Sequence, residues 1–311
     1  MATYKEIHGT NIEVLSSDPV NPVSGQIWFN STSQLLKGAE FNTTAAWASG
    51  GSLNTPRDIA TGCGTQTAAL ALGPGPAHTE QYDGFSWAVG PDLNVNTNRF
   101  AAAGIVTAAI AFGGQPSSNR AETFDGTGWT NVNPMITGRE GLAGCGTQTA
   151  TLAFGGAFPG PAKGALTEEY NGTSWTNGGT LGTSRYYLAG AGTQTAGLAF
   201  GGYGPAGGST EEYDGTSWTS SGPLTATGYL AGAGTQTAGL AFGGKPPSDG
   251  SNVTITYNGT SWSASAPLAN GRSKLGGAGT QTSALAFGGE NTVFTEEFSG
   301  VGNQTKTFSF S

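Results

Sequence analysis

The sequence predicts an all-β protein built as a β-propeller of seven four-stranded blades, with six blades as the alternative. The segment 192–202 returns almost unchanged at 234–244, about 42 residues later. Alternating apolar residues bounded by Gly and by Asn or Asp predict short strands, and no stretch has the period of an amphipathic helix. Four-stranded units repeated at this spacing are typical of propeller blades.

Each repeat is expected to contain four strands, called a, b, c and d in chain order. An Ala/Gly stretch predicts strand a, Gly-Thr-Gln-Thr the next turn, and a Leu-Ala-Phe run strand b. After paired glycines and a loop of changing length, Thr-Glu-Glu-Tyr predicts strand c, Asp-Gly or Asn-Gly a tight turn, and Ser-Trp-Thr strand d. We expect the small residues of strand a at the ring axis, where bulky side chains do not fit.

The two ends of the chain decide the number of blades. An aromatic residue marks strand c seven times, at Phe41, Tyr82, Phe124, Tyr170, Tyr213, Tyr257 and Phe298. Trp marks strand d six times, at Trp47, Trp87, Trp129, Trp175, Trp218 and Trp262. Residues 12–15 and 26–29 are expected to be strands a and b of the first blade, and 305–310 a seventh strand d or the strand that closes the first blade. In the six-blade alternative, the Trp47 strand completes the last blade.

Composition and charge limit the classes of partner. The predicted organisation is a leader and attachment segment at residues 1–24 and a propeller at residues 25–311. A net charge of −8 with only 12 Lys and Arg argues against nucleic acid as a partner. No apolar run approaches the roughly 20 residues of a membrane span, and residues 1–15 lack the form of a secretory signal. We therefore expect no insertion into a membrane.

Residue types that often carry chemistry are interpreted as structural. Cys63 and Cys145 occupy the repeat position of Ala191, so we expect small buried residues and not a disulfide or a nucleophile. The glutamates recur in register, which indicates repeat features and not a unique acid/base pair. One carboxylate per Asp-Gly turn supplies too few oxygen ligands for calcium. We predict no catalytic, cofactor-binding or metal-binding residue, and hence no enzyme.

The repeat resembles the kelch motif over residues from about 57 to 298. One unit carries it as Gly201-Gly202, Tyr213-Asp214 and Trp218. The resemblance implies a propeller and leaves two alternative functions open. An enzyme of the galactose-oxidase type shares the propeller, but its copper ligands include two His, and here the only His are His8 and His78. A cytoplasmic kelch adaptor usually carries a partner domain, for which no residues remain.

The N-terminal region carries a second pattern. Residues 17–32 read Ser-Asp-Pro-Val-Asn-Pro-Val-Ser-Gly-Gln-Ile-Trp-Phe-Asn-Ser-Thr, and 35–38 read Leu-Leu-Lys-Gly. This segment resembles a leader of bacteriophage virion and tail-fibre proteins, and the Gly-Thr-Gln-Thr-Ala repeat is similar to kelch-like proteins of marine phages, notably cyanophages. The resemblance implies a virion structural protein of a tail fibre or capsid surface, assembled in the host cytoplasm. Expected partners are other virion proteins, through the N-terminal segment, and a glycan or protein of the host surface.

The two faces of the predicted ring differ. The a–b and c–d turns share one face and repeat with little change, whereas the b–c and d–a loops share the other and vary in length and sequence. Loops held by a rigid scaffold commonly carry binding. We predict partner or host contact on this varied face, with the candidates Phe158, Lys163, Tyr203, Lys245 and Asp249.

Five units combine an Arg six residues before the strand-a position of Cys63, Ile105, Cys145, Ala191 or Ala278 with a Glu at the start of strand c. The remaining full unit has Thr227 and Ile255 at these two positions, so both partners are missing together. We predict ion pairs that fix the top of the ring. The pairs are Arg57–Glu80, Arg99–Glu122, Arg139–Glu168, Arg185–Glu211 and Arg272–Glu296.

Overall fold

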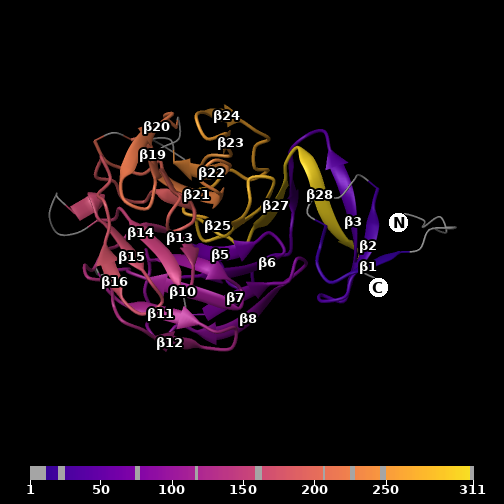
Figure 1. Cartoon of the computed structure of the whole chain (residues 1–311), viewed down its shortest axis with the longest axis horizontal. Coiled ribbons are helices and arrows are strands. Elements are labelled where there is room, and N and C mark those ends of the chain that lie inside the picture. The colour runs from indigo at the N-terminus through magenta and orange to yellow at the C-terminus, as the bar shows by residue number, and fades with distance from the viewer. Residues whose placement is uncertain are drawn as a thin grey trace. The chain divides into compact units, whose positions relative to one another are not determined.

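The protein is all-β and divides into two compact units (Figure 1). The computed structural model describes residues 12–19, 25–73, 78–115, 118–157, 163–205, 207–224, 228–245 and 250–308. One unit comprises residues 1–45 with 299–311, and the other comprises residues 46–298. The described chain forms seven four-stranded sheets and a short 3-10 helix, η1 (Lys163–Ala165), and none of its helices is long and apolar enough to cross a membrane.

Six of the sheets form the propeller ring of the second unit. Blade 1 contains β5 (Thr61–Thr65), β6 (Ala68–Leu72), β7 (His78–Tyr82) and β8 (Trp87–Asp92). Blade 2 contains β9 (Ala101–Ile105), β10 (Ala108–Phe112), β11 (Ala121–Phe124) and β12 (Trp129–Asn131). Blade 3 contains β13 (Ala143–Thr147), β14 (Ala150–Phe154), β15 (Thr167–Tyr170) and β16 (Trp175–Asn177). Blade 4 contains β17 (Ala189–Gly192), β18 (Gly197–Phe200), β19 (Thr210–Tyr213) and β20 (Trp218–Ser221). Blade 5 contains β21 (Gly228–Gly234), β22 (Gly239–Lys245), β23 (Thr254–Tyr257) and β24 (Trp262–Ala264).

The sixth blade is built from distant parts of the chain. It contains β25 (Gly276–Gly279), β26 (Ser283–Phe287), β27 (Thr295–Ser299) and, as its outermost strand, β4 (Ala46–Ser49). The Trp47 ring of β4 packs against Phe242 of blade 5, with 5.1 Å between ring centroids, and against Phe298 of its own blade at 5.0 Å. The innermost strands contact one another around the axis, and β25 contacts β5, so the ring closes with six blades.

The seventh sheet belongs to the other unit. It contains β1 (Glu13–Leu15), β2 (Ile27–Asn30), β3 (Leu35–Asn42) and β28 (Gly302–Phe308) in that order, and β1 runs parallel to β2. Its centre is Trp28, which is fully buried. The Asp18 carboxylate accepts hydrogen bonds from Trp28 Nε1 at 3.0 Å and Asn30 Nδ2 at 2.7 Å, and it pairs with Lys37 at 2.6 Å.

The number of four-stranded sheets matches the seven predicted. The strands expected near 12–15 and 26–29 and a C-terminal strand share one sheet with the Phe41 strand, although β1 pairs with β2 in parallel. The arrangement of these sheets follows the six-blade alternative, since the Trp47 strand completes the last blade of the ring. The expected boundary at residue 24 lies within the first unit, and the division between units falls after residue 45.

Side chains of the repeat lock each blade to the one before it. The Gln of each Gly-Thr-Gln-Thr turn donates to two backbone carbonyls of the preceding blade; Gln148 Nε2, for example, reaches Ala109 O at 3.2 Å and Phe124 O at 2.7 Å. Across the closure, Gln66 of blade 1 bonds Ala284 O and Phe298 O of blade 6. The other glutamines with this pair of bonds are Gln194, Gln236 and Gln281.

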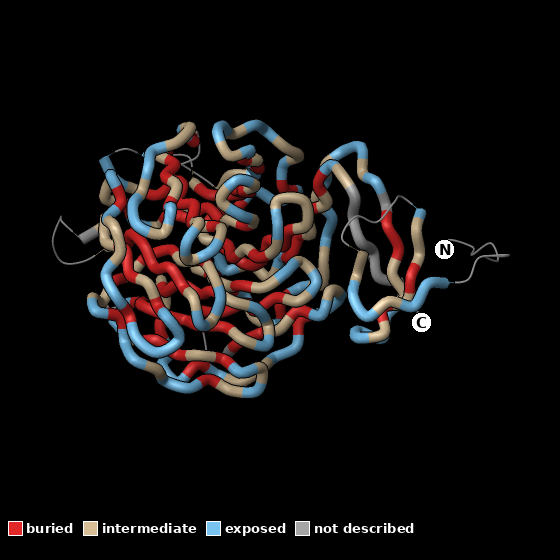
Figure 2. Tube along the Cα trace, viewed as in Figure 1, coloured by how far each residue is buried: buried red, intermediate tan, exposed pale blue. Residues whose placement is uncertain are grey.

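A second lock joins strand d of one blade to strand c of the preceding blade. The indole Nε1 of Trp129 donates to Thr79 Oγ1 at 2.9 Å. Trp175 bonds Asn133 O instead, because Ala121 stands where other blades have the Thr. The tryptophans that bond such a Thr are Trp47, Trp87, Trp129, Trp218 and Trp262. Figure 2 shows the buried residues following the strands of the blades, with exposed residues concentrated in their connections.

Candidate functional site

Six equivalent loop positions meet where the varied face of the ring leads into the innermost strands. Four of them lie two residues after a buried Arg of the predicted pairs, and Arg99 and Tyr229 hold the same position in blades 2 and 5. We call these residues the axial rim. Its members are Ile59, Arg99, Gly141, Tyr187, Tyr229 and Lys274.

Most of the axial rim has a left-handed backbone. The φ angle is 62° at Gly141 but also 59° at Arg99, 52° at Tyr187, and 59° at Tyr229 and Lys274. For a residue with a side chain this conformation costs on the order of 1 kcal/mol. Hydrogen bonds between neighbouring blades hold it, because Tyr187 N donates to Gly141 O at 2.7 Å, Tyr229 N to Tyr187 O at 3.0 Å and Lys274 N to Tyr229 O at 2.8 Å.

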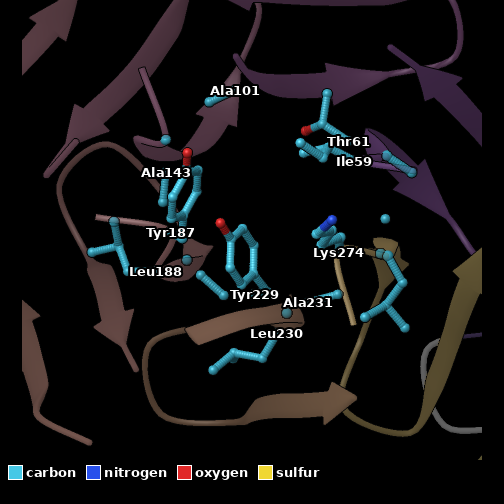
Figure 3. Close-up of a pocket in the computed structure, with 18 of the residues that line it drawn as sticks. Ile59, Thr61, Ala101, Ala143, Tyr187, Leu188, Tyr229, Leu230, Ala231 and Lys274 are labelled. Carbon is cyan, nitrogen blue, oxygen red and sulfur yellow. The ribbon is translucent and has the colours of Figure 1, made fainter. Parts of the chain in front are cut away.

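The axial rim surrounds the mouth of a cavity of about 140 Å³. Its walls are mostly Ala and Gly of the innermost strands, including Ala101, Ala143 and Ala231, which confirms the prediction for strand a. Figure 3 shows Tyr187, Tyr229 and Lys274 reaching into the open space between these walls. The ring axis therefore offers a compact polar hollow enclosed by all six blades.

Tyrosines gather on one side of this mouth. The rings of Tyr187 and Tyr229 stack with 4.3 Å between centroids. Tyr203 lies 5.4 Å from Tyr229, and Tyr186 lies 5.3 Å from Tyr187. Burial raises the pKa of Tyr187 and of Tyr203, and the neighbouring Tyr229 adds to both shifts. These phenols therefore stay protonated at neutral pH and can donate hydrogen bonds.

Two cations flank the stacked tyrosines. Arg99 Cζ lies 5.6 Å from the Tyr187 ring centroid, and Lys274 Nζ lies 5.8 Å from that of Tyr229, within cation–π range. Arg99 also pairs with Glu140 at 2.9 Å and Lys274 with Asp58 at 3.1 Å. Neither carboxylate lines the cavity, and Arg99 and Lys274 are the only charged residues among the described ones that do. Both charged side chains that line the mouth are therefore basic, and each is paired with a carboxylate outside the cavity.

Four of the five predicted ion pairs are present and buried. Nitrogen–oxygen distances are 2.9 Å for Arg57–Glu80, 3.0 Å for Arg139–Glu168 and 2.9 Å for Arg185–Glu211, and Arg272 pairs with Glu296. Blade 5 has no such pair among its described residues, since Ile255 is buried in an apolar cluster and Thr227 lies outside the described part. These pairs lie beneath the rim and fix the loops that carry it.

The predicted Arg99–Glu122 pair is wrong. Arg99 pairs with Glu140, and Glu122 pairs with Arg120. The prediction took Ile105 as the strand-a position, but the left-handed glycine of this strand is Gly104 (φ 110°), which matches Gly146 (φ 107°) in blade 3. The register of blade 2 therefore starts two residues earlier, and Thr97 stands at the arginine position.

The loop candidates of the varied face fall into two groups. Tyr203 forms a β-bridge with Tyr186 and belongs to the tyrosine cluster, so the structure brings it to the axial mouth. Lys245 lines a separate hollow together with Asp58, Glu290 and Asn291. Phe158 and Asp249 lie outside the described residues, as does the side chain of Lys163.

The remaining sequence candidates concern cysteine and histidine. Cys63 and Cys145 are buried free thiols of the innermost strands, as predicted. His8 lies outside the described residues, and so does the side chain of His78. No group of three or more His, Cys, Asp or Glu that could hold a metal ion occurs in the described part.

The axial rim itself was missed by sequence reasoning. A signal existed, because the position two residues after the Arg holds Ile, Gly, Tyr and Lys in four aligned repeats, while the Arg itself is constant. Its meaning depends on ring closure, which alone brings the six positions together. Comparison with protein-family models gave no match for this chain, and comparison with curated proteins gave none.

Proposed function

We propose that the protein is a non-enzymatic structural component of a bacteriophage virion that binds a partner or the host surface through the varied face. The supporting observation is the backbone of the axial rim. Gly141 provides the residue that a left-handed position favours, yet equivalent positions hold Arg99, Tyr187, Tyr229 and Lys274. Strain of this kind clusters at functional sites, since a fold gains nothing from it alone.

The opposite face supports the same proposal by contrast. There the repeated side chains form internal hydrogen bonds, as Gln148 does to blade 2 and as Asp214 does to the amides of Thr216 and Ser217 in its own turn. Residues with these structural tasks have little freedom to vary. Beside its buried ion pairs, the varied face carries side chains that differ from blade to blade, which suits a recognition surface.

The N-terminal unit is proposed to attach the ring to another virion protein, within a tail fibre or on the capsid surface after assembly in the host cytoplasm. The leader resembles phage virion leaders over residues 17–32. Within its described part, Ile12 is 42% and Val14 66% exposed on or beside the edge strand β1. An apolar edge strand is suited to pairing with a partner chain. Residues 1–11 and 20–24 lie outside the described residues.

The varied face is tested with particles that carry Tyr187→Gly together with Tyr229→Gly. Glycine suits the left-handed backbone, as Gly141 demonstrates at the same rim position, so the ring should fold and join particles normally. Adsorption to host cells should fall at least tenfold, the equivalent of about 1.4 kcal/mol. The matched control is Phe85→Ala, an exposed aromatic residue in a c–d turn of the other face. Unchanged adsorption of the double variant would refute a role of this face in host binding.

Attachment is tested by deleting residues 2–10. The deletion lies outside the ring unit, so the purified protein should keep its far-ultraviolet circular dichroism spectrum and its unfolding midpoint. Particles assembled with it should lack the protein, as measured by quantitative mass spectrometry. Normal incorporation would show that these residues are not the attachment segment.

A further inference from the structure

We propose that the axial cavity binds a carboxylate-bearing sugar, such as a uronic acid unit of a surface glycan. This inference rests on the proposed function, because it names the ligand of the varied face. Its first support is the gathering of polar side chains at the ring axis. Figure 3 shows Tyr187 and Tyr229 side by side, with Lys274 across the open space from Tyr187.

The second support is that these groups are donors. Protonated phenols, an ammonium and a guanidinium can all donate hydrogen bonds to a ligand oxygen. Arg99 Nε is buried and has no hydrogen-bond partner among the described residues. Charge-assisted hydrogen bonds to a carboxylate are roughly twice as strong as neutral ones. A cavity surrounded by such donors selects an anionic acceptor.

The third support is the separation of charge across the rim. The chain has 20 acidic against 12 basic residues, yet the described residues lining the cavity include two cations and no acidic side chain. Glu140 and Asp58 neutralise Arg99 and Lys274 from outside the cavity. The site therefore suits a ligand with one or few negative charges, whereas a long polyanion would be repelled by the acidic surface.

The size of the cavity favours a sugar over an acidic peptide. A peptide gains affinity from a free strand edge or a long groove. A hollow of about 140 Å³ enclosed by six strands provides neither. Its Ala and Gly walls let a sugar ring approach the backbone closely, and the two phenols can bond sugar hydroxyls. The terminal or branch unit of a glycan fits these features.

The experiment measures binding of D-glucuronate and of neutral D-glucose to the full-length protein by saturation-transfer NMR and calorimetry. We expect glucuronate to bind and glucose to bind at least tenfold more weakly, a difference of about 1.4 kcal/mol. Lys274→Gln and Arg99→Gln should each lower glucuronate affinity by a similar factor, and Tyr187→Phe with Tyr229→Phe should lower it too. Lys37→Gln, which removes one charge from the other unit, is the matched control and should bind normally.

Each contrary result overturns the inference. Equal affinity for glucose and glucuronate would exclude recognition of the carboxylate, and retained binding by Lys274→Gln and Arg99→Gln would place the ligand elsewhere. Tighter binding of the peptide Gly-Glu-Gly than of glucuronate would assign the cavity to an acidic peptide. If no sugar binds while the double glycine variant of Tyr187 and Tyr229 still loses adsorption, the ligand class is wrong and the proposed function stands. If glucuronate binds and adsorption is unaffected, the proposed function fails alone.

Discussion

Arg139 illustrates how a single residue holds several loops at once. Its Nη1 donates to Gly155 O at 3.0 Å and to Leu166 O at 2.6 Å, and its Nη2 contacts Glu168 at 3.0 Å. The Glu168 carboxylate in turn accepts from the amide of Ile136 at 2.7 Å. One buried pair thus joins the b–c and d–a loops of the blade. Burial lowers the pKa of Arg139 to about 10, and the nearby Glu168 counteracts part of that shift.

Removing one partner of this buried pair should cost more than removing both. Arg139→Met leaves the Glu168 carboxylate buried without its cation, so we expect a loss of about 3–5 kcal/mol in the free energy of unfolding. Adding Glu168→Gln removes that charge and keeps an acceptor for the Ile136 amide, so part of the loss should be recovered. Urea denaturation measures both variants.

The more exposed pair provides the control for this prediction. The Arg99 side chain is 30% exposed in its pair with Glu140, so Arg99→Met should change stability by no more than about 1 kcal/mol. Equal losses for the single and double variants at Arg139 and Glu168 would indicate that the carboxylate is not stranded.

The two buried thiols predict a loss of stability at alkaline pH. Burial raises the pKa of Cys63 and of Cys145 from 9.0 to about 12, so the native state holds its thiol protons more tightly than the unfolded state. The contribution of the protonated thiols to the free energy of unfolding is complete below about pH 9. It is lost as the pH rises toward 12, by up to about 1.4 kcal/mol per pH unit for each thiol. Denaturation at about pH 8 and pH 10.5 should show a steeper decline for the natural protein than for Cys63→Ala with Cys145→Ala. Equal declines would contradict the prediction.

At the scale of the element, the short repeated turns proved the most predictable part of the chain. Asn171 and Asp214 each accept hydrogen bonds from the amides two and three residues later, which is the turn chemistry their sequence indicated. The axial rim was not predictable in the same way. Tyr187 and Tyr229 lie 42 residues apart and stack only because consecutive blades turn about one axis. A strand can be recognised from the repeat itself. A site formed by positions that differ between repeats can be recognised only when the closure of the ring is known.

The turn glutamines should stabilise the contacts between consecutive blades. Gln148→Leu keeps much of the side chain's bulk but leaves Ala109 O and Phe124 O without the donor, and an unsatisfied buried acceptor costs about 1–3 kcal/mol. We expect Gln194→Leu, which breaks the same lock one blade later, to give a similar loss. Thermal denaturation followed by circular dichroism measures the two midpoints. In blade 2 the equivalent residue is Val106, which packs beside an apolar cluster instead.

At the scale of the whole molecule, the ring of residues 46–298 is closed by a strand from its N-terminal end. β4 precedes blade 1 in the chain but forms the outer strand of blade 6, so the ring cannot close until both ends of residues 46–298 are present. Further contacts across this seam come from Gln66 and Trp87 of blade 1, which bond Phe298 O and Thr295 Oγ1 of blade 6. Each blade keeps only its short outermost strand as a sheet edge, and a closed ring has no free terminal blade. Its stability should therefore depend strongly on the closing strand.

A pair of fragments separates the closing strand from the N-terminal unit. Residues 46–298 contain all six blades, so this fragment should be folded and should unfold in one cooperative transition. Residues 56–298 lack β4, which leaves blade 6 with three strands and uncovers Phe242 and Phe298 where Trp47 packs. We expect a midpoint lower by at least about 5 °C, because the shorter fragment loses the half-buried Trp47 and the buried Leu53, the loss of a buried Leu costs about 2–5 kcal/mol, and a domain of this size shifts about 2–4 °C per kcal/mol. Equal midpoints for the two fragments would mean that β4 does not stabilise the closed ring. The hydrogen bonds of Gln66 and Trp87 to blade 6 would then be sufficient to keep the ring closed.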